Sequence, residues 1–207
     1  MSEAASDTDH SAAASVLGYL HQTRWGLLEL LRARTTDPGR SLTLEMHDDI
    51  AWEQGGTPAE LKQLKLHVSA LRNLTDASDD MWRTLRVWMD NGRPGDPYGP
   101  ILTLVTNSSA GAGSAAFLLR DTGRDVTTAL AQLENTARDS TSKETRAARE
   151  QFLKLTPTER VAFVGRIYIA DQSSASAAPR TGSAITSQRT SRFINFLWRT
   201  IDPCRDF

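Results

Sequence analysis

Residues 42–68 constrain the fold of this chain more than any other segment. The run reads LTLEMHDDIAWEQGGTPAELKQLKLHV, and its alternation of apolar and polar residues predicts short strands near 42–47, near 50–53 and around residues 63–65. The segment 54–58, Gln-Gly-Gly-Thr-Pro, has the composition of a turn, in which glycine supplies positive φ and proline ends the strand pairing. The segment therefore predicts adjacent strands of one sheet.

Four polar side chains of these strands are expected to converge. Successive side chains of a strand point to opposite faces, so Gln63 and Lys65 share one face and the leucines beside them take the other. Glu45 lies on the first predicted strand, and Asp49 opens the second. We therefore expect Glu45, Asp49, Gln63 and Lys65 to lie together across neighbouring strands.

This set of residues suits a metal-dependent site that cleaves phosphodiesters. Mg²⁺ prefers hard oxygen ligands and keeps several waters, so one or two carboxylates with a carbonyl oxygen can hold it. Asp49 is the first candidate ligand, with Glu45 and the Gln63 side-chain oxygen as helpers and the Leu64 carbonyl as a further candidate. Lys65 would orient or deprotonate the attacking water, or offset negative charge in the transition state.

The same residues also have a structural interpretation. Acidic pairs such as Asp48-Asp49 commonly cap turns, and a strand lysine commonly extends its ammonium group to water. A glycosidase that used Glu45 and Asp49 as its two carboxyl groups would leave Lys65 unexplained. A noncatalytic protein-interaction or DNA-binding module of the same fold remains the main alternative to the nuclease.

Flanking segments complete the predicted order of elements. Residues 15–34 carry leucines at helical spacing and predict a helix. Gly18, Gln22 and Gly26 follow each other at intervals of four and so share one stripe of this helix. The two glycines predict that the stripe approaches the sheet closely, which would direct Gln22 toward the site. A buried structural amide is the alternative role for Gln22. A second helix is predicted after a cap at Thr75 or Ser78, and a strand over 100–107. The order is helix, three strands, helix, strand.

That order, with four short motifs in it, resembles a known family. The motifs are Gly18-Tyr19-Leu20-His21-Gln22, Leu44-Glu45 followed by Asp48-Asp49-Ile50, Gln63-Leu64-Lys65, and Leu74-Thr75-Asp76 leading to Met81-Trp82-Arg83-Thr84-Leu85 and Trp88. They resemble the nuclease domain of the CD-NTase-associated double-stranded DNA endonucleases, antiphage effectors of bacterial cyclic-oligonucleotide defence (CBASS). That family belongs to the PD-(D/E)xK, or restriction-endonuclease-like, superfamily. The resemblance covers about residues 15–170.

The resemblance implies an α/β fold with a restriction-endonuclease-like core, a mixed sheet flanked by helices, and extra C-terminal helices. It implies cleavage of double-stranded DNA with Mg²⁺, or Mn²⁺ as a substitute, and it matches Asp49 and Lys65 to the catalytic Asp and Lys and Gln63 to the QxK form of the triplet. Two departures are His21, where an aromatic residue is usual, and Asp48, which could compete as the metal ligand.

The resemblance also carries expectations about partners. Members of the family generally continue into a second-messenger-sensing domain, whereas this sequence stops at Phe207, so we expect the sensor on a separate domain or protein. Nucleases of this fold pair two active sites to break both strands, so a homo-oligomer is expected when the protein is active.

Composition bounds the class of protein. The 207 residues contain one cysteine, which excludes an internal disulfide, and no apolar run of the ~18–20 residues needed to span a membrane. The first residues lack the features of a signal peptide, so we expect a cytoplasmic protein with no membrane association. A formal net charge of −1 gives no bulk attraction to phosphate, and DNA affinity would have to come from a local patch or an accessory domain.

The domain organisation follows the composition. Residues 1–14 are expected to form a disordered tail, and residues 15–170 the nuclease domain. Residues 171–191 are small and polar with no periodic apolar face, which predicts a linker. Residues 192–207 include the apolar run FINFLW and are expected to form a C-terminal apolar tail or the start of a further domain.

Overall fold

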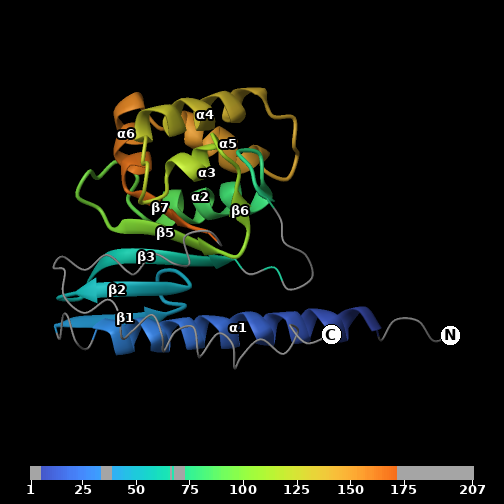
Figure 1. Cartoon of the computed structure of the whole chain (residues 1–207), viewed down its shortest axis with the longest axis vertical. Coiled ribbons are helices and arrows are strands. Elements are labelled where there is room, and N and C mark those ends of the chain that lie inside the picture. Colours follow the sequence, from blue (N-terminus) through green and yellow to red (C-terminus); the bar gives the residue numbers. More distant parts are fainter. Residues whose placement is uncertain (1–5, 34–38, 66, 68–72, 172–207) are drawn as a thin grey trace. The chain divides into compact units, whose positions relative to one another are not determined.

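The computed structural model describes residues 6–33, 39–65, 67 and 73–171. Five strands form one mixed sheet in the order β1-β2-β3-β5-β7, and two short strands, β4 and β6, pair beside it (Figure 1). The β1–β2 and β2–β3 pairs are antiparallel, whereas the β3–β5, β5–β7 and β4–β6 pairs are parallel. The strands are β1 Arg40–Leu44, β2 Ile50–Gln54, β3 Thr57–Lys65, β4 Asn73–Leu74, β5 Ile101–Thr106, β6 Ser109–Ala110 and β7 Ile167–Ala170.

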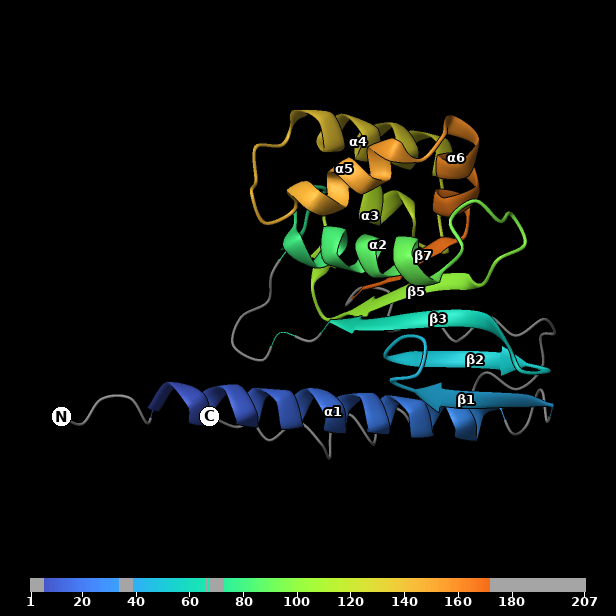
Figure 2. The same cartoon turned by 180° about the vertical axis from the view of Figure 1, so that it is seen from behind.

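Helices flank this sheet, which confirms the predicted mixed α/β architecture. In Figure 2, α2 to α6 lie together beyond β5 and β7, whereas α1 lies beside β1. The expected order is present as α1, β1 to β3, α2 and β5, with the two-residue β4 added before α2. The helices are α1 Ser6–Ala33, α2 Asp79–Asn91, α3 Ala115–Leu118, α4 Val126–Asp139, α5 Arg146–Lys154 and α6 Pro157–Gly165.

The β2–β3 hairpin forms where its glycines allow it. Gly55 and Gly56 have φ values of 60° and 78°, a left-handed pair that favours glycine and that matches the twist of a two-residue hairpin. The prediction that Pro58 ends the strand pairing is wrong, because Pro58 lies inside β3 opposite Glu53. A register shift between Trp52 and Glu53 accommodates the missing proline N–H, as bulges commonly do.

The first strand is shorter than predicted. It ends at Leu44 rather than near His47, because Glu45 adopts a φ of 56° and turns the chain out of the extended conformation. The side chain of Met46, predicted to lie on the apolar face, is 70 % exposed. The residues between Leu44 and Ile50 therefore form a tight connection that delivers two aspartates to the start of β2.

The core lies on one face of the sheet. Ala51, Leu61 and Leu104 from three neighbouring strands are buried there with Trp82 and Trp88 of α2. Residues of β3 alternate between this face and the opposite one, so the side chains that follow Leu61 on the same face are those of residues 63 and 65.

The opposite face holds a buried ion pair between α1 and the sheet. The Glu29 carboxylate accepts a hydrogen bond from Lys62 Nζ at 2.6 Å and one from Trp52 Nε1 at 3.2 Å. Glu29 and Lys62 are each 7 % exposed, and a buried charge needs such a partner. The pair therefore ties α1 to β2 and β3.

Helix α1 differs from its prediction in two respects. It begins at Ser6, so the backbone of residues 6–14, predicted to be a disordered tail, is helical; alanine and N-terminal aspartate in this segment favour a helix. A Cβ at Gly26 would lie 3.1 Å from Leu44 Cδ2, which confirms close approach there, whereas a Cβ at Gly18 would meet no atom within 4 Å. The stripe is tight only at Gly26, and at Gly18 the prediction is wrong.

Several predicted segments lie outside the described residues. They are Leu66, predicted to share a strand face with Leu64, residues 172–191 of the predicted linker and the predicted C-terminal segment 192–207. Within the ranges that are described, no helix combines the length and the apolar character needed to cross a membrane.

Local signals account for the ends of the later helices. Thr156 and Glu159 form a reciprocal capping box with Pro157 in the first turn of α6, as that sequence pattern favours. Just after α6, the Arg166 guanidinium donates to the backbone oxygens of Gly92, Arg93 and Pro100 at 3.1, 2.8 and 2.7 Å. One buried side chain thus holds the loop that leads from α2 into β5.

Replacement of this guanidinium by a single ammonium group should destabilise the protein. An Arg166→Lys variant keeps the charge but loses the planar fork that serves several carbonyl groups. Loss of two or more charge-assisted hydrogen bonds predicts a decrease of about 3 kcal/mol in the free energy of unfolding, measurable by urea denaturation. Arg93→Lys is the matched control, because that side chain is 53 % exposed; equal effects of the two substitutions would contradict the role of Arg166.

Candidate functional site

The Asp48 carboxylate is a buried acceptor for three donors. Asp48 Oδ1 accepts from the backbone N–H of Asp49 at 2.9 Å and from Gln63 Nε2, and Asp48 Oδ2 accepts from Trp88 Nε1 at 2.7 Å. The residue is 7 % exposed. Burial raises the pKa of Asp48 above its ordinary value, and the hydrogen bonds from Gln63 and Trp88 act against this shift. Asp48 joins the turn before β2 to β3 and α2.

The neighbouring carboxylate of Asp49 is bound to the backbone of β3. Asp49 Oδ2 accepts from the Leu64 N–H at 2.7 Å, and the side chain is half-buried. Burial is the largest cause that raises the pKa of Asp49; the Leu64 hydrogen bond and the charge of Lys65 lower it, while the carboxylates of Asp48 and Glu45 raise it. The structure therefore brings Asp49 into the electrostatic environment of Lys65, Asp48 and Glu45.

These contacts distinguish the two aspartates. Both oxygens of Asp48 are occupied by N–H donors, and the carboxylate is sealed from solvent. Asp49 has one such hydrogen bond among the residues that the structure describes and is more accessible. Asp49 is therefore the better candidate for a metal ligand, and Asp48 is the group that orients its surroundings.

The other two predicted ligands, Glu45 and Gln63, contact the Asp48-Asp49 pair. Glu45 is exposed, and its backbone N–H donates to the Asp49 carbonyl oxygen at 3.3 Å. Gln63 is 5 % exposed, and because its Nε2 donates to Asp48, its Oε1 is the atom left to act as a ligand.

In the part of the chain that the structure describes, the site offers oxygen donors from Asp49, Glu45 and Gln63 but no cluster of charged metal ligands. Among the described residues, no three His, Cys, Asp or Glu side chains are grouped so that they could hold a metal ion. Structural zinc requires such a set, whereas Mg²⁺ keeps several waters and binds through one or two carboxylates with substrate phosphate. The Asp49 carboxylate and the Gln63 amide oxygen are the atoms on which a Mg²⁺ site of that second kind would depend here.

A cavity adjoins these residues at the end of β3. It has a volume of about 200 Å³ and takes its lining from α1, the end of β3 and the first turn of α2. The lining residues are Gly18, His21, Gln22, Leu64, Lys65, His67 and Asp80. The structure thus brings the predicted Gln22 and Lys65 to one cavity, and Leu64 connects that cavity to the Asp49 carboxylate.

Sequence reasoning missed two members of this site. His67 Nε2 lies 2.6 Å from Asp80 Oδ2, and neither residue was among the predicted site residues. The alternation that places Gln63 and Lys65 on one face would have placed His67 there too. Trp88, which the sequence offered only as part of a motif, donates its indole N–H to Asp48.

No protein-family model, curated protein or solved structure matches the chain. The evidence for a function therefore lies in the chemistry and arrangement of the site itself.

Neutralising Asp49 should stabilise the protein. The pKa of Asp49 is raised above 3.8 in the folded state, so folding favours the protonated carboxyl group. The protonated group therefore stabilises the folded protein fully below pH ~3.8, and this stabilisation is lost as the pH rises through the raised pKa. In EDTA at pH 7, Asp49→Asn should raise the melting temperature by about 2–4 °C, the shift that ~1 kcal/mol produces in a domain of this size. The gain should shrink toward acid pH, and exposed Asp139→Asn should show no such trend.

Gln63→Glu should have the opposite effect. It replaces the Nε2 donor by a second buried carboxylate against Asp48, which leaves two like charges in contact. We expect a loss of about 2–4 kcal/mol in the free energy of unfolding at pH 7, and a smaller loss near pH 5 as one of the pair takes up a proton. Exposed Gln54→Glu is the matched control in chemical denaturation; comparable losses in both variants would argue against the contact.

Proposed function

We propose that the chain is a metal-dependent endonuclease domain that hydrolyses phosphodiester bonds of double-stranded DNA. The single observation that carries this proposal is the placement of Asp49. Its carboxylate accepts a hydrogen bond from the Leu64 N–H and interacts electrostatically with Lys65, and both Leu64 and Lys65 line the cavity.

The arrangement of elements supports a restriction-endonuclease-like core. Helix α1 precedes an antiparallel β1-β2-β3 meander, α2 follows it, and β5 then pairs parallel to β3. Helices α3 to α6 and β7 extend this core toward the C-terminus. This is the order implied by the resemblance to CD-NTase-associated antiphage endonucleases, and we propose a role as an effector of that kind in the cytoplasm.

Each residue of the site has a chemical task in this proposal. Asp49 and the Gln63 amide oxygen are the groups that would hold Mg²⁺ or Mn²⁺, and Glu45 adds a third oxygen donor from the exposed side. The bound metal supplies Lewis-acid polarisation of the phosphate and lowers the pKa of coordinated water. Lys65 would orient the water or offset charge that develops on the phosphate.

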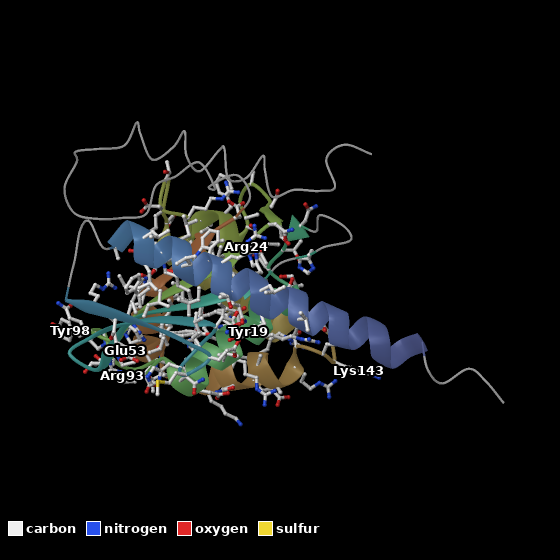
Figure 3. The ribbon with its side chains drawn as sticks, turned by 90° about the horizontal axis from the view of Figure 1, so that it is seen from below. Tyr19, Arg24, Glu53, Arg93, Tyr98 and Lys143 are labelled. Atoms are coloured by element: carbon white, nitrogen blue, oxygen red, sulfur yellow. The ribbon has the colours of Figure 1, made fainter. Side chains whose placement is uncertain are left out.

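DNA binding would depend on local charge rather than on the bulk of the chain. The formal net charge is −1, so the basic side chains near the cavity must supply the attraction. Arg24, on the exposed part of α1 in Figure 3, is one such group. A second copy of the chain and a separate second-messenger sensor are the further partners in this proposal.

One observation favours a noncatalytic alternative. The donors to Asp48 come from Gln63, Trp88 and the Asp49 backbone, and that network is complete without a metal. A DNA-binding or protein-interaction module that had lost catalysis would keep the same contacts for stability.

Plasmid cleavage separates the two functions. Purified wild type should cut a supercoiled plasmid with Mg²⁺ or Mn²⁺ and not with EDTA. Asp49→Ala and Lys65→Ala should each lower the rate by at least about 10²-fold, because each removes a group that acts on the reacting phosphate.

Matched surface variants make the test specific. Lys143→Ala changes an exposed lysine on the loop before α5, which is labelled in Figure 3. Asp139→Ala changes an exposed aspartate at the end of α4. Both variants should cut the plasmid at the wild-type rate. Cleavage that survives in the Asp49 and Lys65 variants would move the activity elsewhere. Absence of cleavage with either metal, with or without a cyclic-oligonucleotide sensor protein, would favour the noncatalytic module.

A further inference from the structure

The ring of His67 is held by residues from two other segments. Its backbone N–H donates to Asn107 Oδ1 at 2.9 Å, and its carbonyl oxygen accepts from Asn107 Nδ2 at 2.8 Å. Its ring Nε2 lies 2.6 Å from Asp80 Oδ2 in the first turn of α2. The backbone and one ring nitrogen are therefore both fixed, and the side chain is 19 % exposed.

The Asp80 contact selects one tautomer of the ring. A carboxylate that is ionised only accepts hydrogen bonds, and with Asp80 in that form the 2.6 Å contact assigns the donor role to Nε2. In the neutral imidazole the proton then sits on Nε2, and Nδ1 keeps its lone pair. An acid that orients an imidazole in this way is the arrangement that makes the other ring nitrogen a proton acceptor.

The same ring lines the cavity beside the Asp49 site. His67 shares that lining with Lys65 and Gln22, and Leu64 connects it to the Asp49 carboxylate through the 2.7 Å hydrogen bond. A volume of about 200 Å³ holds several waters, each of which occupies about 30 Å³ in the liquid. The cavity is therefore large enough to hold water beside the lining residues His67 and Lys65.

Charged and titratable groups from three elements line the cavity around the His67 ring. Strand β3 contributes the Lys65 ammonium group, α2 contributes Asp80, and α1 contributes His21. Burial, and then the charge of Arg24, lowers the pKa of His21 below 6.5, so that ring is neutral at pH 7. Of the two histidines in the lining, His67 is the one whose tautomer a carboxylate sets.

We propose that His67, oriented by Asp80, is the general base of the hydrolysis. One O–H bond of the attacking water breaks as its proton passes to His67 Nδ1, and the water oxygen bonds to phosphorus. The phosphorus–oxygen bond to the leaving strand breaks, the leaving oxygen takes a proton from solvent, and the imidazolium returns its proton to solvent. Lys65 then offsets phosphate charge rather than deprotonating water. This assignment rests on the proposed nuclease function.

The test is the pH dependence of single-turnover plasmid cleavage in Mg²⁺. A general base acts only when it is unprotonated, so the wild-type rate should rise with pH and then level off. His67→Gln should cut about 10²–10⁴-fold more slowly and lose this rise. Free imidazole should restore part of the activity of His67→Ala. Asp80→Asn, which no longer selects the tautomer, should be slower than wild type by about tenfold or more.

Controls separate catalysis from folding. His47→Gln changes a partly exposed histidine paired with Glu53 and should keep the wild-type rate and pH profile. Circular dichroism and thermal unfolding establish that each variant is folded. If His67→Gln does not fold, the role of His67 is tested instead by the cleavage rate of Asp80→Asn and by ¹⁵N NMR of the wild-type imidazole ring. The NMR spectrum is expected to show the Nε2–H tautomer.

Each remaining outcome has a definite meaning. Cleavage by wild type with an unchanged pH profile in His67→Gln, or an Nδ1–H tautomer in the ring spectrum, overturns the role of His67 and leaves the nuclease in place. No cleavage by wild type with Mg²⁺ or Mn²⁺ overturns the proposed function, and the role of His67 falls with it.

Discussion

Burial of the Asp48 carboxylate is the constraint on which the site depends. A buried carboxylate without donors would be strongly unfavourable, and here three N–H groups from three segments supply them, including Gln63 and Trp88. Satisfying that group fixes the turn before β2 against β3 and α2. Asp49 is then held with its carboxylate at the Leu64 N–H, beside the lysine one residue further along β3.

Strand β3 carries two lysines that lie in different environments. Lys62 points to the face covered by α1 and is 7 % exposed in an ion pair with Glu29; it fastens the helix to the sheet. Lys65 points to the other face, beyond the apolar cover of α2, and lines a cavity. Burial and partners, rather than residue type, separate the structural lysine from the candidate catalytic one.

Nuclease and noncatalytic module share most of this architecture. The Asp48 network and the Glu29–Lys62 pair stabilise the fold in either case. The proposed catalysis depends in addition on the Asp49 carboxylate, on the amide oxygen of Gln63, and on a cavity that Lys65 and His67 line. Residues that stabilise the fold and residues proposed for the chemistry are therefore neighbours, and Asp49 and Gln63 belong to both groups.

The sequence alone determined the features that depend on neighbours along the chain. Period-two alternation indicated the strands, Gly55-Gly56 the hairpin, and Thr156 with Glu159 the start of α6. Tertiary structure decided which aspartate is available as a ligand, because the Trp88 donor to Asp48 comes from 40 residues away. It also decided that Asp80 serves His67. Hydrogen-bond partners and burial are set by segments distant in the sequence, and local patterns do not encode them.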